Sequence, residues 1–203
     1  MLTLYHSPQS RSTRIIGLLM AMGALDRVNV RIVSIPRQDG SGGRDPANPH
    51  PEGKVPLLVH DGVEIWESTA IILYLTDLFP AAEFGVPAGD KQRGRFLSWL
   101  SWYGAVVEPV VIFNHMGLED PVLQATFRGM PEIIARLRTA LSEGPWLMGE
   151  RLTAADLLVA SPFLWFPDAT PDDSLIRDWV DRVANLPWQG ALMDYEANHM
   201  APA

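Results

Sequence analysis

Residues 53–68 read Gly-Lys-Val-Pro-Leu-Leu-Val-His-Asp-Gly-Val-Glu-Ile-Trp-Glu-Ser, and this stretch decides the fold of the first part of the chain. Two short apolar runs, 57–59 and 63–66, flank Asp61-Gly62. Asp-Gly between such runs favours a β-hairpin, because glycine tolerates the positive φ that a tight turn requires. From Glu67-Ser68 onward apolar residues recur at three- and four-residue spacing, which predicts a helix. The predicted order is strand, turn, strand, helix.

The residues before this hairpin predict a βαβ unit. Residues 2–5 read as a strand, 15–22 as a helix that ends near Gly23, and 28–35 as a second β-rich run. Strand, helix and strand in so few residues favour parallel strands, and the hairpin with its helix extends the pattern to βαβ-ββα. This is the order of a thioredoxin-like α+β domain, which we place at residues 1–80.

The rest of the chain is predicted to be all helical. Residues 81–89 carry glycine and proline breaks and are predicted to be a linker, so that a helical domain occupies 90–203. Pro109 is expected to kink or break the first helix, because it removes a backbone hydrogen bond. Helices are expected over 91–113, 127–141, 175–184 and 188–195.

Residues 152–157, Leu-Thr-Ala-Ala-Asp-Leu, predict the start of another, buried helix. Thr153 and Asp156 are spaced as a capping box, and Leu152 and Leu157 as the hydrophobic staple that flanks it. We therefore interpret Asp156 as a helix cap and not as a catalytic acid.

Composition excludes several classes of function. The 203 residues are 47% hydrophobic, carry a net charge of −8 and include no cysteine. The negative charge disfavours nonspecific binding to nucleic acid or to anionic membranes. Without cysteine the chain has no disulfide and no thiolate metal ligand, and its five histidines lack the spacing of a metal site. We expect no nucleic-acid partner, no metal, no membrane-spanning segment and a cytoplasmic location.

A family resemblance now joins these patterns. Lys54-Val55-Pro56 and Glu67-Ser68, with the hairpin between them, resemble the glutathione-binding half of cytosolic glutathione S-transferases. The Thr-x-x-Asp box at 153–156 is similar to the folding motif of that family's helical domain. The resemblance implies a cis bond before Pro56, which would present the Val55 backbone to the cysteinyl unit of glutathione.

The same resemblance assigns the other glutathione contacts. The γ-glutamyl carboxylate is expected at the start of the helix, held by backbone N–H groups and the Ser68 hydroxyl, with Glu67 facing the ammonium. Lys54 belongs to the same set. Arg37 and His50 flank a glycine-rich loop, and either is a candidate for the glycyl carboxylate of glutathione.

The loop between the first strand and the first helix is the expected place of the reactive group. Ser7-Pro-Gln-Ser-Arg11 resembles the Ser-Pro-x-Ser-Arg pattern of serine-type, bacterial-like glutathione transferases, whose hydroxyl donates to the glutathione sulfur. This assigns Ser10 as the catalytic residue, with Ser12, Ser7 and Tyr5 as alternatives. From local sequence alone, Ser10 or Ser12 serves equally well as a helix N-cap. No His/Asp pattern around Ser10 supports a hydrolase triad.

The resemblance implies conjugation of glutathione, a co-substrate, to small hydrophobic electrophiles. Trp102 and Tyr103 are candidates for the electrophile pocket, although aromatic residues are more often core or dimer contacts. A noncatalytic ligand-binding or partner-docking protein of transferase-like fold, and a glutathione-dependent isomerase or dehalogenase, remain alternatives. The family pairs subunits, and the apolar excess over residues 99–111 agrees with a homodimer.

Overall fold

The structure is a computed structural model that describes residues 1–200, and it divides into two compact units. Unit 1 combines Met1–Ala82 with the stretch that begins at Pro187, and unit 2 is Glu83–Leu186. Each unit has its own buried apolar core. We describe the units separately.

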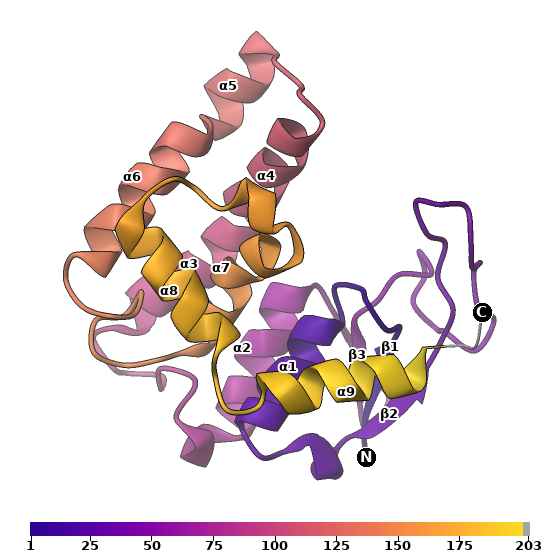
Figure 1. Cartoon of the computed structure of the whole chain (residues 1–203). Coiled ribbons are helices and arrows are strands. Elements are labelled where there is room, and N and C mark those ends of the chain that lie inside the picture. The colour runs from indigo at the N-terminus through magenta and orange to yellow at the C-terminus, as the bar shows by residue number, and fades with distance from the viewer. Residues whose placement is uncertain (201–203) are drawn as a thin grey trace. The chain divides into compact units, whose positions relative to one another are not determined.

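A four-stranded mixed sheet forms the centre of unit 1 (Figure 1). Its order is β2-β1-β3-β4, with β1 parallel to β2 and antiparallel to β3, and β3 antiparallel to β4. In the turn between β3 and β4, Asp61 and Gly62 have φ values of 49° and 85°, so the Asp-Gly prediction is confirmed. The strands are β1 (Leu2–His6), β2 (Asn29–Ile32), β3 (Leu57–His60) and β4 (Val63–Trp66).

The helices of unit 1 are α1 (Thr13–Ala21), α2 (Ser68–Leu78) and α9 (Gln189–His199), with 3-10 turns at Leu25–Arg27 and Pro80–Ala82. The thioredoxin-like βαβ-ββα order is therefore as predicted. The core consists of side chains from the sheet and from α1 and α2, namely Leu4, Leu57, Leu58, Ile15, Ile16, Leu19, Ile71, Ile72 and Leu75.

The helix α9 corrects the predicted domain division, which assigned all of 90–203 to the helical domain. It belongs to unit 1 and lies beside α1 (Figure 1). The two helices approach closely at Gly17, where an added Cβ would lie 3.1 Å from a methyl carbon of Leu192. Side-chain contacts from α9 to the loop before α1, described below, explain why this helix packs there.

Unit 2 is helical. One continuous helix runs through α3 (Arg93–Trp102), a π-helical turn (Tyr103–Val107) and α4 (Glu108–His115). The others are α5 (Pro121–Phe127), α6 (Met130–Leu141), α7 (Ala154–Trp165) and α8 (Ser174–Ala184), with a 3-10 turn at Pro167–Ala169. Phe96, Leu100, Ile133, Leu137, Leu158, Phe163, Ile176 and Trp179 are buried.

Pro109 does not break its helix as the sequence suggested. The π-helical turn lies immediately before it, and Glu108 N–H donates to the carbonyl of Tyr103, five residues back. A wider turn at this point accommodates a residue that has no N–H and whose ring crowds the preceding carbonyls. The axis of the helix therefore continues to His115.

The continuous helix 93–115 also corrects an expectation about membranes. Over 23 residues, with a mean hydropathy of 1.5 in its most apolar part, it is long and apolar enough to cross a bilayer by length and composition alone. A core helix of a water-soluble domain passes the same test. This helix buries Phe96, Leu100, Tyr103 and Val107, as a core helix does.

The predicted helix 127–141 begins later than expected, and the helix before it was missed. Asp120 caps α5 by accepting hydrogen bonds from Val122 and Leu123 N–H, at 2.8 and 3.2 Å. Arg128 then takes a positive φ of 66°, and Gly129 is fully extended. These two residues separate α5 from α6.

The capping box at the start of α7 is confirmed. Thr153 Oγ1 accepts from Ala155 N–H at 3.3 Å, and Asp156 Oδ2 accepts from Thr153 N–H at 3.0 Å. The other carboxylate oxygen of Asp156 accepts from Leu147 N–H at 2.8 Å and from the indole N–H of Trp179 at 3.1 Å. Asp156 is fully buried and joins three segments of unit 2.

Candidate active site at one end of the sheet

The strand register brings the predicted glutathione-binding segments to one end of the sheet in unit 1. Tyr5 pairs with Leu57, and Leu57 pairs with Trp66. The residues that follow β1, precede β3 and follow β4 therefore lie at the same end. The Val55–Pro56 bond, just before β3, is cis, as the resemblance implied.

The serines after β1 form a compact hydrogen-bonded group. Ser10 Oγ lies 2.6 Å from the carbonyl of Ser7, to which it donates, and 2.8 Å from Ser12 Oγ. Ser7 N–H donates to Ser12 Oγ at 3.1 Å, and Ser12 N–H donates to Ser10 Oγ at 3.2 Å. Ser12 is 0% exposed and Ser10 is 8% exposed, so of the two Ser10 is the hydroxyl nearer the surface.

Ser12 occupies the N-cap position of α1, yet its side chain makes no capping bond. Its hydroxyl instead lies 2.7 Å from Nδ1 of His6, the last residue of β1. The interpretation of Ser12 as an ordinary N-cap is therefore wrong. The hydroxyl serves a side-chain network.

A buried histidine and glutamate, which the sequence analysis did not single out, complete this network. His6 is fully buried, and its Nε2 lies 3.2 Å from Oε1 of Glu196 on α9. The other oxygen of Glu196 accepts from Gln9 N–H at 2.6 Å and from the Thr13 hydroxyl at 2.8 Å. Burial raises the pKa of Glu196, but the neighbouring His6 and the hydrogen bonds from Gln9 and Thr13 outweigh burial and leave this pKa below its usual value.

The remaining predicted contacts in the loops lie as follows. Arg37 holds the serine loop, because its Nη2 donates to the carbonyl of Pro8 at 2.8 Å and to Ser7 Oγ at 3.2 Å. His50 is buried, and its Nδ1 accepts from Glu52 N–H at 3.0 Å. Lys54 is exposed and forms an ion pair with Glu52.

Glu67 and Ser68 lie where β4 passes into α2. Glu67 has a positive φ of 69° and makes no side-chain capping bond, and its carbonyl accepts from Ile71 N–H at 3.0 Å. Ser68 is the first residue of α2 and is 9% exposed. The first N–H groups of α2 thus point toward the same end of the sheet as the serine loop.

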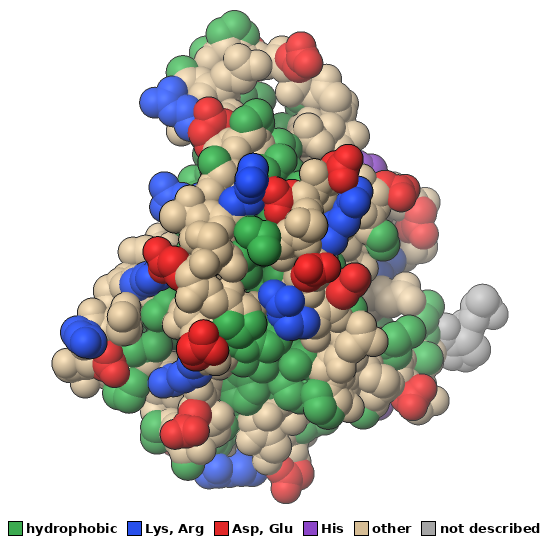
Figure 2. Space-filling view, turned by 60° about the vertical axis from the view of Figure 1, so that its left-hand side comes forward, with side chains coloured by type: hydrophobic (Ala, Val, Ile, Leu, Met, Phe, Trp, Pro, Cys, Tyr) green, Lys and Arg blue, Asp and Glu red, His purple; other side chains and the backbone are tan. Residues whose placement is uncertain are grey.

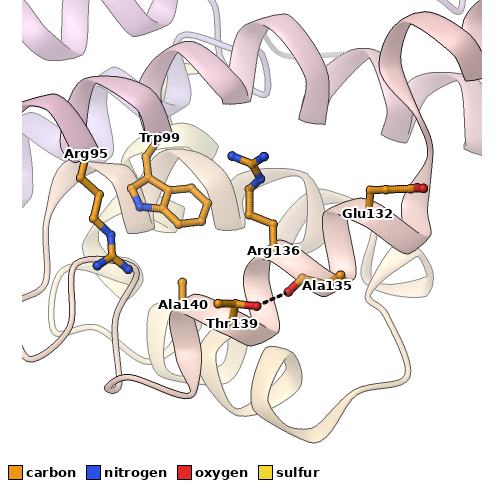
Figure 3. A pocket seen from close by; sticks show the side chains of 7 residues that line it. All are labelled: Arg95, Trp99, Glu132, Ala135, Arg136, Thr139 and Ala140. Atoms are coloured by element: carbon orange, nitrogen blue, oxygen red, sulfur yellow. Dashed lines mark hydrogen bonds between the residues drawn. The ribbon is translucent and has the colours of Figure 1, made fainter.

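The two candidates for the electrophile pocket belong to unit 2. Tyr103 is buried, and Trp102 packs edge-on against Trp99, with the ring centroids 5.3 Å apart. The guanidinium of Arg136 lies over Trp102, 5.1 Å from the ring centroid. A surface hollow of about 480 Å³ nearby is lined by Trp99 but by neither candidate (Figure 3). Its lining residues are Arg95, Trp99, Glu132, Ala135, Arg136, Thr139 and Ala140.

On the face drawn in Figure 2, basic and acidic side chains are interspersed and do not separate into a basic field. Within residues 1–200, no group of three or more His, Asp or Glu side chains is placed to hold a metal ion.

Comparisons with known proteins agree with this geometry. Residues 4–83 match the N-terminal domain of glutathione S-transferases, and residues 110–187 match the C-terminal domain. Glutathione S-transferase GstA of Escherichia coli O157:H7 is 26% identical over 121 residues, a match that spans 57% of this chain and 59% of that protein. Glutathione S-transferase 1 of Manduca sexta is 26% identical over 200 residues, which are 91% of this chain and 88% of the relative.

Solved structures show the same similarity along almost the whole chain. A glutathione transferase from Methylococcus capsulatus has a TM-score of 0.75 and 27% identity, covering 98% of this chain and 100% of that one. A sphingomonad glutathione S-transferase complexed with glutathione has a TM-score of 0.73 and 24% identity, with coverages of 96% and 98%. With its thioredoxin-like sheet, its cis-proline and its helical second unit, the chain belongs to the glutathione S-transferase family.

Proposed function

We propose that this protein is a glutathione transferase, which activates the thiol of glutathione as a thiolate and conjugates it to small hydrophobic electrophiles. The observation that carries this proposal is the position of the Ser10 hydroxyl. It lies in the loop just before α1, at the same end of the sheet as the cis Val55–Pro56 bond and the start of α2. This one end of the sheet would therefore offer partners for the backbone, the carboxylate and the sulfur of a tripeptide thiol.

Glutathione binding is assigned to the loops around this end. The Val55 backbone would pair with the cysteinyl unit as a sheet edge pairs with a strand. Ser68 and the first N–H groups of α2 would hold the γ-glutamyl carboxylate, and Glu67 would face the ammonium. Lys54 and Arg37 supply positive charge for the glycyl end, and Arg37 also fixes the loop that carries Ser10.

The energetics of thiol activation are within reach of these groups. A free thiol has a pKa of about 8.5, and lowering it by about two units requires roughly 2.7 kcal/mol of preferential thiolate stabilisation. A hydroxyl that donates to a charged sulfur contributes about 1.5 to 3 kcal/mol, and a helix N-terminus adds about 0.3 to 1 kcal/mol. Ser10 now donates to the Ser7 carbonyl at 2.6 Å, so its hydroxyl would turn from that oxygen to the sulfur.

The Ser10→Ala variant tests this assignment. Loss of the hydroxyl is expected to raise the pKa of the bound thiol by about one to two units and to slow conjugation roughly ten- to a hundredfold at neutral pH. The measurements are the ultraviolet absorbance of the thiolate across pH and the conjugation of an electrophilic aryl halide. Ser68→Ala is the matched serine variant and is expected to weaken glutathione affinity while leaving the thiol pKa unchanged.

The wild-type protein must show the activity itself. Glutathione binding without turnover across a panel of electrophiles would favour a noncatalytic transferase-like protein. No detectable glutathione binding would overturn the proposal. An unchanged thiol titration in Ser10→Ala would move the donor to a backbone N–H or another side chain.

We also propose a cytoplasmic homodimer, on the basis of the family resemblance. The helix 93–115 leaves the apolar side chains of Leu97 and Ile112 more than one-third exposed, and these are available to a partner subunit. A monomer mass by light scattering at micromolar concentration would count against the dimer.

A further inference from the structure

The ring of His6 lies between a carboxylate and a hydroxyl in the interior of unit 1. Nε2 faces the Glu196 carboxylate at 3.2 Å, and Nδ1 faces the Ser12 hydroxyl at 2.7 Å. Ser12 in turn lies 2.8 Å from Ser10. Four side chains thus form one continuous chain from α9, through β1 and the serine loop, to the hydroxyl assigned to the glutathione sulfur.

The carboxylate decides which nitrogen of His6 carries the proton. The pKa of Glu196 lies below its usual value, so this carboxylate is ionised near neutral pH, and its negative charge 3.2 Å from Nε2 favours a proton on that nitrogen. Neutral His6 then has a bare Nδ1, which accepts the hydrogen of Ser12. Ser12 Oγ, which also accepts from Ser7 N–H, can accept the hydrogen of Ser10 once that hydroxyl turns away from the Ser7 carbonyl, and Ser10 Oγ can then accept from a thiol. After that single rotation, the hydroxyl hydrogens of Ser10 and Ser12 both point toward His6.

We propose that Ser10, Ser12 and His6 form a proton relay, in which His6 Nδ1 receives the proton of the bound glutathione thiol and Glu196 is the positioning residue. This inference rests on the proposed function. The S–H bond breaks as an O–H bond forms on Ser10, the Ser10 hydrogen passes to Ser12, and the Ser12 hydrogen passes to Nδ1. The products are a thiolate and an imidazolium that faces the Glu196 carboxylate, so net charge is conserved.

The relay also leaves the serines in the arrangement that a thiolate needs. After transfer, Nδ1–H donates to Ser12, Ser12 donates to Ser10, and Ser10 donates to the sulfur. One shift of three hydrogens therefore both ionises the thiol and turns Ser10 into the donor that stabilises it. A hydrolase triad does not fit the same residues, because Ser12 is 0% exposed and has no access to an external substrate.

The other groups around His6 do not compete for this proton. The ring of Tyr195, also on α9, is tilted against His6, with centroids 6.1 Å apart, and burial raises the pKa of its hydroxyl, so that Tyr195 stays neutral. Arg37 binds the outer side of the loop through Pro8 and Ser7. Glu196 is the carboxylate placed against the ring, and its charge offsets that of the imidazolium that the relay forms.

The Glu196→Gln variant should move the proton of neutral His6 from Nε2 to Nδ1, with almost no change in the shape of the side chain at position 196. Gln9 N–H and the Thr13 hydroxyl require an acceptor, so the amide oxygen of the new side chain faces them. Its NH₂ group then faces His6 Nε2 and donates to it, which moves the histidine proton to Nδ1. Nδ1 can no longer accept a proton from Ser12. Nitrogen NMR of the His6 ring should show the Nε2–H form in the wild type and the Nδ1–H form in the variant, both without ligand.

The decisive measurement is the number of protons released when glutathione binds. Calorimetry in buffers of different ionisation enthalpy gives this number, and ultraviolet absorbance gives the thiolate formed. In the wild type we expect thiolate formation with close to no proton released, because His6 retains the proton. In Glu196→Gln we expect the pKa of the bound thiol to rise by about one unit, a tenfold loss of thiolate at pH 6, and any thiolate to form with release of its proton.

The sign separates the relay from simple electrostatics. Removing a negative charge near a thiolate would by itself lower the thiol pKa, which is the opposite of the expected change. Asp194→Asn removes the same charge from an exposed position on α9 and should leave the proton count and the pKa as in the wild type. His6→Asn keeps an acceptor beside Ser12 but cannot take up a proton, so it should release the proton to the buffer. This second variant tests the relay if Glu196→Gln folds poorly.

Each outcome decides the question. A wild-type thiolate that forms with release of one proton, or a thiol pKa unchanged in both Glu196→Gln and His6→Asn, would overturn the relay while leaving the proposed function intact. A wild-type bound thiol that titrates near 8.5, as free thiols do, would overturn the proposed function and the relay with it.

Discussion

Asp156 in unit 2 and Glu196 in unit 1 are both buried carboxylates, but burial has opposite consequences for them. Burial raises the pKa of Asp156 to about 6, although four hydrogen bonds oppose the shift. For Glu196 the hydrogen bonds outweigh burial, and the pKa falls. Asp156 accepts from backbone N–H groups, a hydroxyl and an indole, whereas Glu196 also faces a histidine.

The groups that contact each carboxylate, and not its burial, distinguish the structural Asp156 from Glu196, which contacts the candidate site. The donors around Asp156 cannot give up or take up a proton near neutral pH, so this residue only fastens segments together. The imidazole beside Glu196 can change its protonation state, and it leads to the serine loop. A strongly raised pKa alone would therefore have pointed to Asp156, whose partners are those of a structural residue.

The largest expected effect comes from Asp156→Ala. It leaves the N–H donors of Leu147, Thr153 and Trp179 without an acceptor in a dry environment. At about 1 kcal/mol or more for each donor, the free energy of unfolding should fall by about 3 to 4 kcal/mol. Urea denaturation followed by tryptophan fluorescence measures this change. Asp178→Ala, at an exposed position of α8, should change stability by less than about 0.5 kcal/mol.

The pH dependence of stability should differ in sign between the two carboxylates. The folded-state pKa of Asp156 is raised, so its contribution is fully present below about pH 3.8 and is lost as pH rises through about 6, a change of about 3 kcal/mol. The pKa of Glu196 is lowered, so its contribution is present above its unfolded pKa and is lost as pH falls through the folded value.

Denaturation of the wild type, Asp156→Asn and Glu196→Gln from pH 4 to pH 8 separates these terms. In Asp156→Asn the free energy of unfolding should no longer fall as pH rises from 4 to 7. In Glu196→Gln it should no longer fall as pH drops toward 4, and its dependence at higher pH should be unchanged. If both variants changed the free energy of unfolding in the same direction over the same pH range, the two carboxylates would not differ in the way described.

The smallest expected effect is that of Thr13→Val. This change removes the hydroxyl that donates to Glu196 and accepts from Ser10 N–H at 3.3 Å, and it keeps the Gln9 N–H and His6 partners of Glu196. Stability should fall by about 1 kcal/mol, while the pKa of the bound thiol stays unchanged, because the His6 tautomer is preserved. Thr13→Ser restores the hydroxyl and should recover the stability. A thiol pKa that moved in Thr13→Val but not in Thr13→Ser would mean that the donor set, and not the tautomer, controls the site.

Local chemistry made much of the fold predictable. Asp61-Gly62 predicted its hairpin and Thr153–Asp156 its capping box, because the interactions that form them lie within a few residues. The failures also have local causes. The helix around Pro109 continues through a π-helical turn, which has no simple sequence signal, and the short helix 121–127 carries too few apolar residues for a clear period.

The site was predictable only where residues are close in sequence or carried by the family pattern. The cis-proline came from the family pattern and is confirmed, whereas the role of Ser10, which came from the same pattern, stays a prediction. Glu196 is separated from Gln9 by 187 positions and lies on a helix with no marked apolar face, so nothing local connects it with the serines. His6 lies only four residues before Ser10, but the acid beside it is brought there only when α9 packs against α1.

The return of the chain to unit 1 also sets an order of events during protein synthesis. A ribosome that has finished residues 1–82 must make all of Glu83–Leu186 before it reaches α9, which takes roughly 5 to 20 seconds at typical rates. Throughout that interval the nascent thioredoxin-like sheet holds His6 without its glutamate. The side-chain network around His6 is therefore completed in each new molecule only when α9 is translated, after both units have otherwise had time to fold.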